Sequence, residues 1–382
     1  MKHLRHVLPL AALAFTASAA AALEAEVRAD LGYDSNVFTL NDVIGVRDGL
    51  FAELQAGAGV SRKSESGASL GIDAGLAARR YESTVSDGDE TRAYLRLRGD
   101  SGGKKSEHAF DWALRYRLQD STYVSRFSGT VATHDGTPSG VPIGDRYDAG
   151  IGDARGAWHL PGGRYGRVSL EGSVESKDYR KDYAALGLDR LDYLQFGAEP
   201  RYETGERARR VRIALPLARR QYRDRRVSDA AGNPVAGTDL EYTYYGLEAR
   251  YDHALSEASE LDFAGGYEIR TDNGVGYRDR KRWSIGGEWV YKPAAKTRVS
   301  AGAEWSSRVF DRPVTGDPTI IDETPEKDGY TLNARYAAPV PGVGIRDFSM
   351  LAEARWESFD NSNDVRFTYD RLEFLAGLRK AF

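Results

Sequence analysis

The residues best suited to chemistry are six arginines between positions 79 and 117, which recur at alternate positions of predicted strands. They are Arg79, Arg92, Arg96, Arg98, Arg115 and Arg117. Successive side chains of a β-strand point to opposite faces, so these guanidinium groups share one face. Because neighbouring strands lie about 5 Å apart, the six would form one basic strip that attracts anions.

Three glutamates occupy equivalent positions on later strands of the same kind: Glu268, Glu288 and Glu304. If the strands form a ring, these carboxylates lie across it from the arginine strip. The resulting field across a water-filled lumen would orient and select charged solutes, so we predict that both sets line a pore. The alternative is that arginine and glutamate pair across neighbouring strands and only keep the lumen wet.

The elements that would position these residues are strands with a period of two. The last stretch, residues 369–382, shows the pattern clearly: every second residue from Leu372 to Leu378 is apolar, and most of the intervening residues are polar, including Arg371 and Glu373. One face of such a strand contacts an apolar medium and the other contacts water. The same alternation recurs along almost the whole chain.

Composition narrows the class of protein. The chain has 382 residues, a mean hydropathy of −0.54 and a formal charge of −4. Beyond the N-terminus it lacks the apolar runs of about 20 residues that a helical membrane protein needs. It has no cysteine, so hydrogen-bonded strands rather than disulfides must hold the fold. The mild acidity does not suggest a nucleic-acid partner. A transmembrane barrel fits, since its strands are only half apolar.

We therefore predict an all-β fold: a single transmembrane antiparallel β-barrel of about 16 strands, with 14 or 18 as alternatives. Longer connections follow the first, fifth, ninth and thirteenth predicted strands, which places both termini in the periplasm. The long loops span residues 36–49, 125–145, 227–239 and 313–328. We also expect a β-bulge near residues 152–156 and a lost ladder donor at Pro216.

The first 22 residues have the composition of a secretory signal peptide. Lys2 and Arg5 supply the positive start, residues 7–15 form the apolar core, and small residues precede cleavage after Ala19 or Ala22. The predicted organisation is a signal peptide over residues 1–22 and a barrel over residues 23–382, in the cell outer membrane of a Gram-negative bacterium.

The loop of residues 125–145 is the longest, and it is rich in glycine and proline. In its position it resembles the loop that folds into general porins and narrows them. If it folds inward, Asp135 and Asp145 would face the arginine strip. The alternative is a loop that stays at the surface.

Two short motifs carry a family resemblance. Residues 32–37, GYDSNV, together with DNSN at residues 360–363, YDR at 369–371 and Gly377-Leu378, resemble the barrels of surface lipoprotein assembly modifiers and of exopolysaccharide-associated outer-membrane proteins. The resemblance implies a role in export or assembly of a surface polymer or lipoprotein. Alternatively, the first motif only marks a strand-to-loop transition, where Asp and Asn favour the turn. The final strand, ending at Phe382, resembles the terminal signature of bacterial outer-membrane proteins, which implies contact with the barrel assembly machinery.

The chain does not read as an enzyme. His108, His134, His159 and His253 follow the predicted signal peptide, and none stands in a recognisable Ser–His–acid pattern. No spacing matches a metal cage, and no phosphate-binding loop is found, so we predict neither metal nor cofactor.

These observations predict an outer-membrane channel for passive or substrate-selective diffusion of small solutes that are charged or sugar-like. The alternative is a barrel that exports or assembles a surface polysaccharide or lipoprotein. The expected partners are outer-membrane lipid, lipopolysaccharide, the assembly machinery, and the solutes or a polysaccharide, with no nucleic acid.

Overall fold

A computed structural model describes residues 22–41, 44–102, 108–125, 129–137, 139–163, 165–188, 191–206, 208–229, 233–276, 279–294, 296–311, 326–340, 348–361 and 368–382. The predicted signal peptide lies outside these residues, except for Ala22, which begins the first strand. Two short 3-10 helices, η2 (Ser83–Gly88) and η3 (Ala184–Leu186), lie in connections. Within the described ranges, no helix is long and apolar enough to cross a membrane.

Strands make up most of the described chain. The first half contains β1 (Ala22–Asp34), β2 (Gly49–Lys63), β3 (Ser69–Tyr81), β4 (Glu90–Asp100), β5 (Ala109–Ser121), β6 (Ala149–His159), β7 (Arg167–Tyr179) and β8 (Tyr193–Glu206). The second half contains β9 (Arg209–Ala214), β10 (Leu217–Ser228), β11 (Pro234–Ala254), β12 (Ser259–Asp272), β13 (Arg280–Tyr291), β14 (Arg298–Phe310), β15 (Glu326–Pro339), β16 (Phe348–Asn361) and β17 (Tyr369–Ala381).

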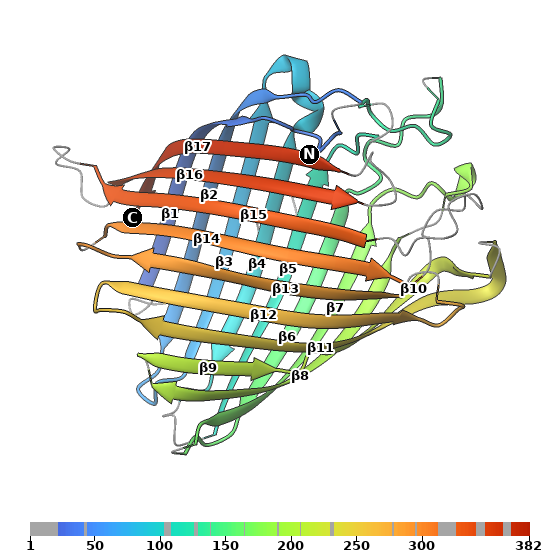
Figure 1. The fold of residues 1–382 in the computed structure, drawn as a ribbon. Helices are drawn as coiled ribbons and strands as arrows, with labels where there is room; N and C mark the ends of the chain where they lie inside the picture. Colours follow the sequence, from blue (N-terminus) through green and yellow to red (C-terminus); the bar gives the residue numbers. More distant parts are fainter. Residues whose placement is uncertain are drawn as a thin grey trace.

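These strands form one closed antiparallel barrel (Figure 1). Each pairs with the strand before and after it in the chain, apart from the β9–β10 interruption described next. The two ends of the chain close the ring, because β1 pairs with β17 from Glu26–Ala381 to Asp34–Glu373. Closure leaves no unpaired edge among the described strands, which a barrel in lipid requires.

The barrel has sixteen strand positions, because β9 and β10 share one position and both pair with β8 and β11. The interruption falls at Leu215-Pro216, where the predicted loss of a ladder donor occurs. Both residues of this interruption still bond to the neighbouring strands: Leu215 N donates to Pro200 O of β8 at 3.0 Å, and Gly246 N of β11 donates to Pro216 O at 2.8 Å. The predicted count of 16 and the all-β barrel are confirmed.

Alternation places apolar side chains outside and charged ones inside. Leu31 is 71% exposed on the outer face, whereas its neighbour Asp30 is 3% exposed on the inner face. The outer band includes Leu54, Leu76, Leu114, Leu170, Phe196, Leu247, Phe263, Ile285, Leu332, Phe374 and Leu378. A closed barrel with such a band spans a bacterial outer membrane, and the band contacts lipid. The predicted location is therefore confirmed.

The two ends of the barrel differ in the length of their connections. Residues 122–148 join β5 to β6 at one end, here called the loop end, whereas residues 255–258 join β11 to β12 at the other, the turn end. Both termini of the described chain lie at the turn end, since Glu26 pairs with Ala381. That the turn end faces the periplasm stays a prediction.

Two local predictions were wrong. The bulge expected near residues 152–156 is absent, since β6 pairs in unbroken register with β5 and β7. Ile151 faces the lumen instead, between its register partners Arg117 and Lys177, whose long aliphatic stems suit an apolar neighbour. The predicted loop over residues 227–239 is also shorter, because β10 and β11 extend to Ser228 and from Pro234.

Candidate functional site: the lumen wall

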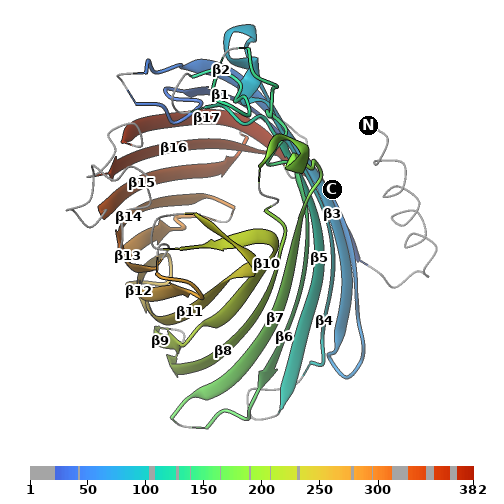
Figure 2. The same cartoon turned by 90° about the vertical axis from the view of Figure 1, so that its right-hand side faces the viewer.

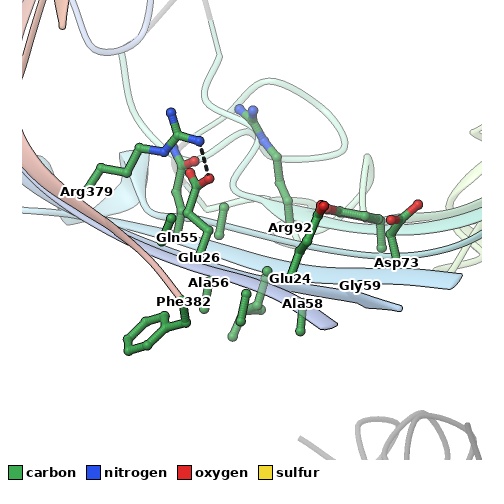
Figure 3. A pocket seen from close by; sticks show the side chains of 16 residues that line it. Glu24, Glu26, Gln55, Ala56, Ala58, Gly59, Asp73, Arg92, Arg379 and Phe382 are labelled. Atoms are coloured by element: carbon green, nitrogen blue, oxygen red, sulfur yellow. Dashed lines mark hydrogen bonds and ion pairs between the residues drawn. The ribbon is translucent and has the colours of Figure 1, made fainter. Parts of the chain in front are cut away.

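The lumen wall is lined by charged side chains of both signs. Near the turn end, Figure 3 shows Arg379 of β17 and Glu26 of β1 directed at one another, with Arg92 and Asp73 on neighbouring strands. Arg379 Nη2 lies 2.5 Å from Glu26 Oε2. A lumen lined in this way contains water and ions rather than a packed core, as is usual for barrels of sixteen strands.

The six predicted arginines lie on β3, β4 and β5, and five of them lie beside carboxylates. Arg79 Nε is 2.6 Å from Glu53 Oε2, and its Nη1 is 3.0 Å from Glu373 Oε2. The other ion pairs are Arg92–Glu90, Arg98–Asp73 at 3.1 Å, Arg115–Asp153 at 2.9 Å, Arg117–Asp153 at 3.5 Å and Arg117–Glu175 at 3.4 Å. Arg96 stands between Asp73 of β3 and Arg115 of β5 in the strand register and has no ion pair among the described residues. Most of this strip is therefore neutralised locally.

The three predicted glutamates lie on β12, β13 and β14, strands that face β3, β4 and β5 across the barrel (Figure 2). They also have cationic neighbours. Glu268 Oε1 is 2.9 Å from Arg280 Nη2. Glu288 lies 3.9 Å from Arg298, and Glu304 lies 4.0 Å from Arg282. All three glutamates, like five of the six arginines, thus have partners of opposite charge.

A cluster of arginines that sequence reasoning did not single out lies on this same wall. It consists of Arg220, Arg270, Arg280, Arg282 and Arg308, from β10, β12, β13 and β14, and we call it the arginine patch. Arg270 stands directly opposite Arg280, and Arg282 directly opposite Arg308. Alternation along β13 was a signal that could have found it, since Arg280 and Arg282 share the inward face with Glu288.

Tyrosine rings support one side of the arginine patch. Arg220 Cζ lies 4.1 Å from the centroid of the Tyr193 ring, and Arg270 Cζ lies 4.4 Å from that of Tyr242. Tyr193, Tyr222 and Tyr242 are buried and contact one another edge to face, with centroids 5.7 and 5.6 Å apart. Cations over ring faces are held in place by the ring quadrupole.

The GYDSNV motif forms a different structure, at the β1–β17 closure. Asp34 is fully buried and accepts hydrogen bonds from Arg371 Nε at 3.0 Å and from Tyr81 Oη at 3.0 Å. Arg371 also forms an ion pair with Glu373 at 3.0 Å, and Glu373 forms a second ion pair with Arg79. A chain of ion pairs therefore joins β1, β17 and β3. We call this group the closure network.

The rest of the motif attaches the β1–β2 connection to the same place. Asn36 Nδ2 donates to the carbonyl oxygens of Leu40 at 2.8 Å and Asp370 at 2.9 Å. Leu372 N donates to Ser35 Oγ at 2.7 Å. The motif near the start of the chain thus binds the YDR motif near its end. These contacts give both motifs a structural role, which is sufficient to explain their residues.

The described part of the long loop packs against other connections at the loop end. Arg47 Nη1, from the β1–β2 connection, donates to Gly129 O at 3.0 Å. Asp145 contacts Tyr183 and lies 3.2 Å from Lys181, both in the β7–β8 connection. Asp135 accepts hydrogen bonds from Thr137. Both acids thus have partners within the loops, and no contact between them and the arginine strip is found in the described ranges.

Asp148, at the base of this loop, gives a pH dependence of stability. Burial raises its pKa to about 6, and the charges of Asp120 and Asp145 act in the same direction. The unfolded carboxyl titrates near pH 4, so between about pH 4 and 6 the folded form binds more protons. The free energy of unfolding should therefore fall as the pH rises through this window, by at most about 3 kcal/mol.

Urea unfolding at a series of pH values, followed by tryptophan fluorescence, measures this effect. The Asp148→Asn variant keeps an acceptor for Ser121 N, which donates to Asp148 Oδ1 at 3.0 Å. Its stability should lose the fall between pH 4 and 6 that the wild type shows. Identical pH profiles for the two proteins would show that Asp148 titrates normally.

A Ser–His–Asp chain of hydrogen bonds occurs near the turn end, where sequence reasoning saw none. His159 Nδ1 lies 2.7 Å from Ser169 Oγ, and its Nε2 lies 2.6 Å from Asp111 Oδ2. Ser169 is buried within β7, and its backbone is paired with that of His159 in the β6–β7 strand pair. Backbone N–H groups in a ladder are not available to form an oxyanion hole, so this geometry favours a structural hydrogen-bond chain.

Within the described ranges, no group of three His, Cys, Asp or Glu side chains is arranged to hold a metal ion.

No protein-family model matches the chain, and no curated protein matches it. Solved structures with a similar course of the backbone are outer-membrane expressed OmpT of Vibrio cholerae, OpdO of Pseudomonas aeruginosa and an anion-selective porin from Comamonas acidovorans. Their sequence identities are 12%, 14% and 12%, with TM-scores of 0.44, 0.46 and 0.45. The matches cover 96%, 95% and 95% of this chain, and 99%, 97% and 99% of the respective structures.

Proposed function

We propose that the chain is a channel, not an enzyme, through which small charged or sugar-like solutes diffuse passively across the outer membrane. The observation that carries this proposal is the charged inner face of a closed sixteen-position barrel. Sixteen strands enclose an aqueous lumen rather than a packed interior. Solutes would cross without covalent chemistry, and the wall charges would set preference.

The predicted pore-lining residues have unequal parts in this proposal. Arg98 and Arg115 lie beside Asp73 and Asp153, so each contributes little net charge to the lumen. Arg96 has no ion pair among the described residues, although Asp73 stands opposite it on β3, so it is the least neutralised arginine of the strip. Selectivity from the strip therefore depends more on Arg96 than on its neighbours.

Export or assembly of a surface polymer is the weaker proposal. Its support was the resemblance of the two terminal motifs. Asp34 and Asn36 bind Arg371 and the Asp370 carbonyl at the barrel closure, which gives these residues a structural role. Any barrel that closes its ring through these contacts would need Asp34 and Asn36, whatever solute it transports.

Single-channel conductance and ion selectivity in planar lipid bilayers test the channel. The purified protein should give a large, steady conductance. The Arg96→Ser, Arg98→Ser, Arg115→Ser variant should remain open and show a lower preference for anions, because three cations leave one wall.

A single Arg96→Ser variant isolates the contribution of the one strip arginine without an ion pair among the described residues. A barrel that stays closed in the bilayer would contradict the passive channel and favour the export or assembly role. An open pore whose selectivity is the same in all three proteins would keep the channel but make the strip structural.

A further inference from the structure

We infer that the arginine patch is a binding site for multivalent organic anions, meaning solutes with two or more carboxylate or phosphate groups. This inference rests on the proposed channel function for its biological role and names the class of solute that the channel takes up. The binding itself can be measured without conductance.

The first support is the placement of like charges in register. Arg270 faces Arg280 across the β12–β13 pair, and Arg282 faces Arg308 across the β13–β14 pair. Arg308 in turn faces Lys327 of β15. Like charges directly opposite one another destabilise a sheet. A bound anion would remove this repulsion, since one oxyanion can neutralise two facing guanidinium groups.

The second support is a set of unused hydrogen-bond donors. The Nε atoms of Arg280, Arg282 and Arg308 are buried and have no hydrogen-bond partner within the part of the chain that the structure describes. Buried polar groups without partners are uncommon in folded proteins. Arginine offers its donors in a planar fork that matches carboxylate and phosphate oxygens, so these are the ligands that suit the patch.

The third support is a shortage of carboxylates. Arg220, Arg270, Arg280 and Arg282 line one hollow of about 530 Å³, in which the acids are Glu248 and Glu268. Glu268 is already bound to Arg280 at 2.9 Å. The facing wall differs, because five of the six arginines of the strip form ion pairs, whereas Arg220 and Arg308 of the patch form none among the described residues. Positive charge is thus in excess at this hollow, where four arginines meet two glutamates.

The fourth support is rigidity. Arg220 lies over Tyr193, its Nε donates to Gln195 Oε1 at 2.9 Å, and Arg270 lies over Tyr242. Side chains fixed in this way lose less conformational entropy when a ligand binds. The tyrosines behind the patch therefore preorganise it, and the guanidinium groups make the contacts.

The test is transient block of the chloride current by citrate and by pyrophosphate, with sucrose as the neutral probe. Citrate supplies carboxylates and pyrophosphate supplies phosphates, so the two probes distinguish the sources of the anion. The test variant is Arg282→Gln, Arg308→Gln. The matched control is Arg98→Gln, Arg115→Gln, which removes the same charge from the facing wall.

We expect at least one of the two anions to block the wild-type channel and sucrose to leave it open. In the test variant, the affinity of the channel for the blocking anion should fall at least about tenfold, because two charge-assisted contacts are lost. In the control variant, this affinity should change less than about twofold. Equal weakening in both variants would show a general lumen field and overturn the site. An open channel that neither anion blocks would overturn it as well, while the channel function would stand.

Titration calorimetry in detergent separates the two proposals. A closed barrel that still binds citrate or pyrophosphate, with the same dependence on Arg282 and Arg308, would support the site and contradict the channel. A closed barrel that binds neither would overturn both. Heat-modified migration on gels would confirm that each variant is folded.

Discussion

Replacing Gly377 by alanine is expected to lower the free energy of unfolding by about 3 kcal/mol, because the new methyl group has no room at the barrel closure. Gly377 of β17 stands directly opposite Asp30 of β1. A Cβ atom at this position would lie 2.8 Å from Asp30 Cγ and still closer to Asp30 Oδ1 and the Ala29 carbonyl oxygen. Carbon atoms need about 3.5–4 Å between them.

The neighbours of Gly377 cannot yield easily. Asp30 is buried, and its Oδ2 lies 2.7 Å from Arg28 Nε in an ion pair. The Ala29 carbonyl oxygen belongs to the backbone of β1 and moves only if the β1–β17 pairing shifts. This pairing closes the ring, so a shift exposes two strand edges to lipid, where unpaired backbone groups are costly.

Urea unfolding in detergent, with heat-modified migration on gels to measure the folded fraction, tests the Gly377→Ala prediction. Gly172→Ala is the matched control, since Gly172 lies in β7 and a Cβ there meets no atom within 4 Å. The control should be as stable as the wild type or slightly more stable, because alanine restricts the unfolded chain. Equal stability of the two variants would contradict the predicted clash.

Alternation in the sequence was sufficient to predict the barrel, because each strand is wet on one face and in lipid on the other. Leu31 and Asp30 illustrate this, since neighbours in sequence lie on opposite faces. An apolar residue on the inner face, Ile151, broke the local alternation and suggested a bulge that does not exist. Its environment between Arg117 and Lys177 depends on two other strands, which local periodicity cannot show.

The charged wall was harder to predict, because ion pairs depend on the register between strands and alternation fixes only the face. Arg98 was expected to contribute free positive charge, yet Asp73 of β3 lies 3.1 Å away. Register also places Arg270 opposite Arg280 on the wall that was expected to be acidic. A shift of two residues between these strands would keep every side chain on its face and change every partner.

The terminal motifs show the same dependence on contacts distant in sequence. Asp34 and Arg371 are separated by most of the chain, and their pairing follows only from ring closure. Read alone, GYDSNV indicates a turn. In the closed barrel it supplies a buried carboxylate, an amide and a hydroxyl that bind the last strand.

Replacing Asp34 by alanine should therefore be nearly as damaging as the change at Gly377, with a loss of about 3 kcal/mol in the free energy of unfolding. Asp34 is fully buried and accepts hydrogen bonds from Arg371, from Tyr81 Oη at 3.0 Å and from Asn36 N at 3.0 Å. Alanine leaves three donors without this acceptor. Arg371 keeps its contact with Glu373 at 3.0 Å, which limits the loss.

Two further variants make this prediction specific. Asp48→Ala removes an exposed acceptor near the same strands, to which Tyr33 Oη donates at 2.8 Å, and should cost less than about 0.5 kcal/mol. Asp34→Asn keeps an acceptor of the same shape but loses the charge, so its stability should lie between wild type and Asp34→Ala. If Asp34→Ala unfolds at the same urea concentration as Asp48→Ala, the closure network does not hold the ring. An unchanged Asp34→Asn variant beside a destabilised Asp34→Ala would instead assign the effect to hydrogen bonding rather than to the ion pair with Arg371.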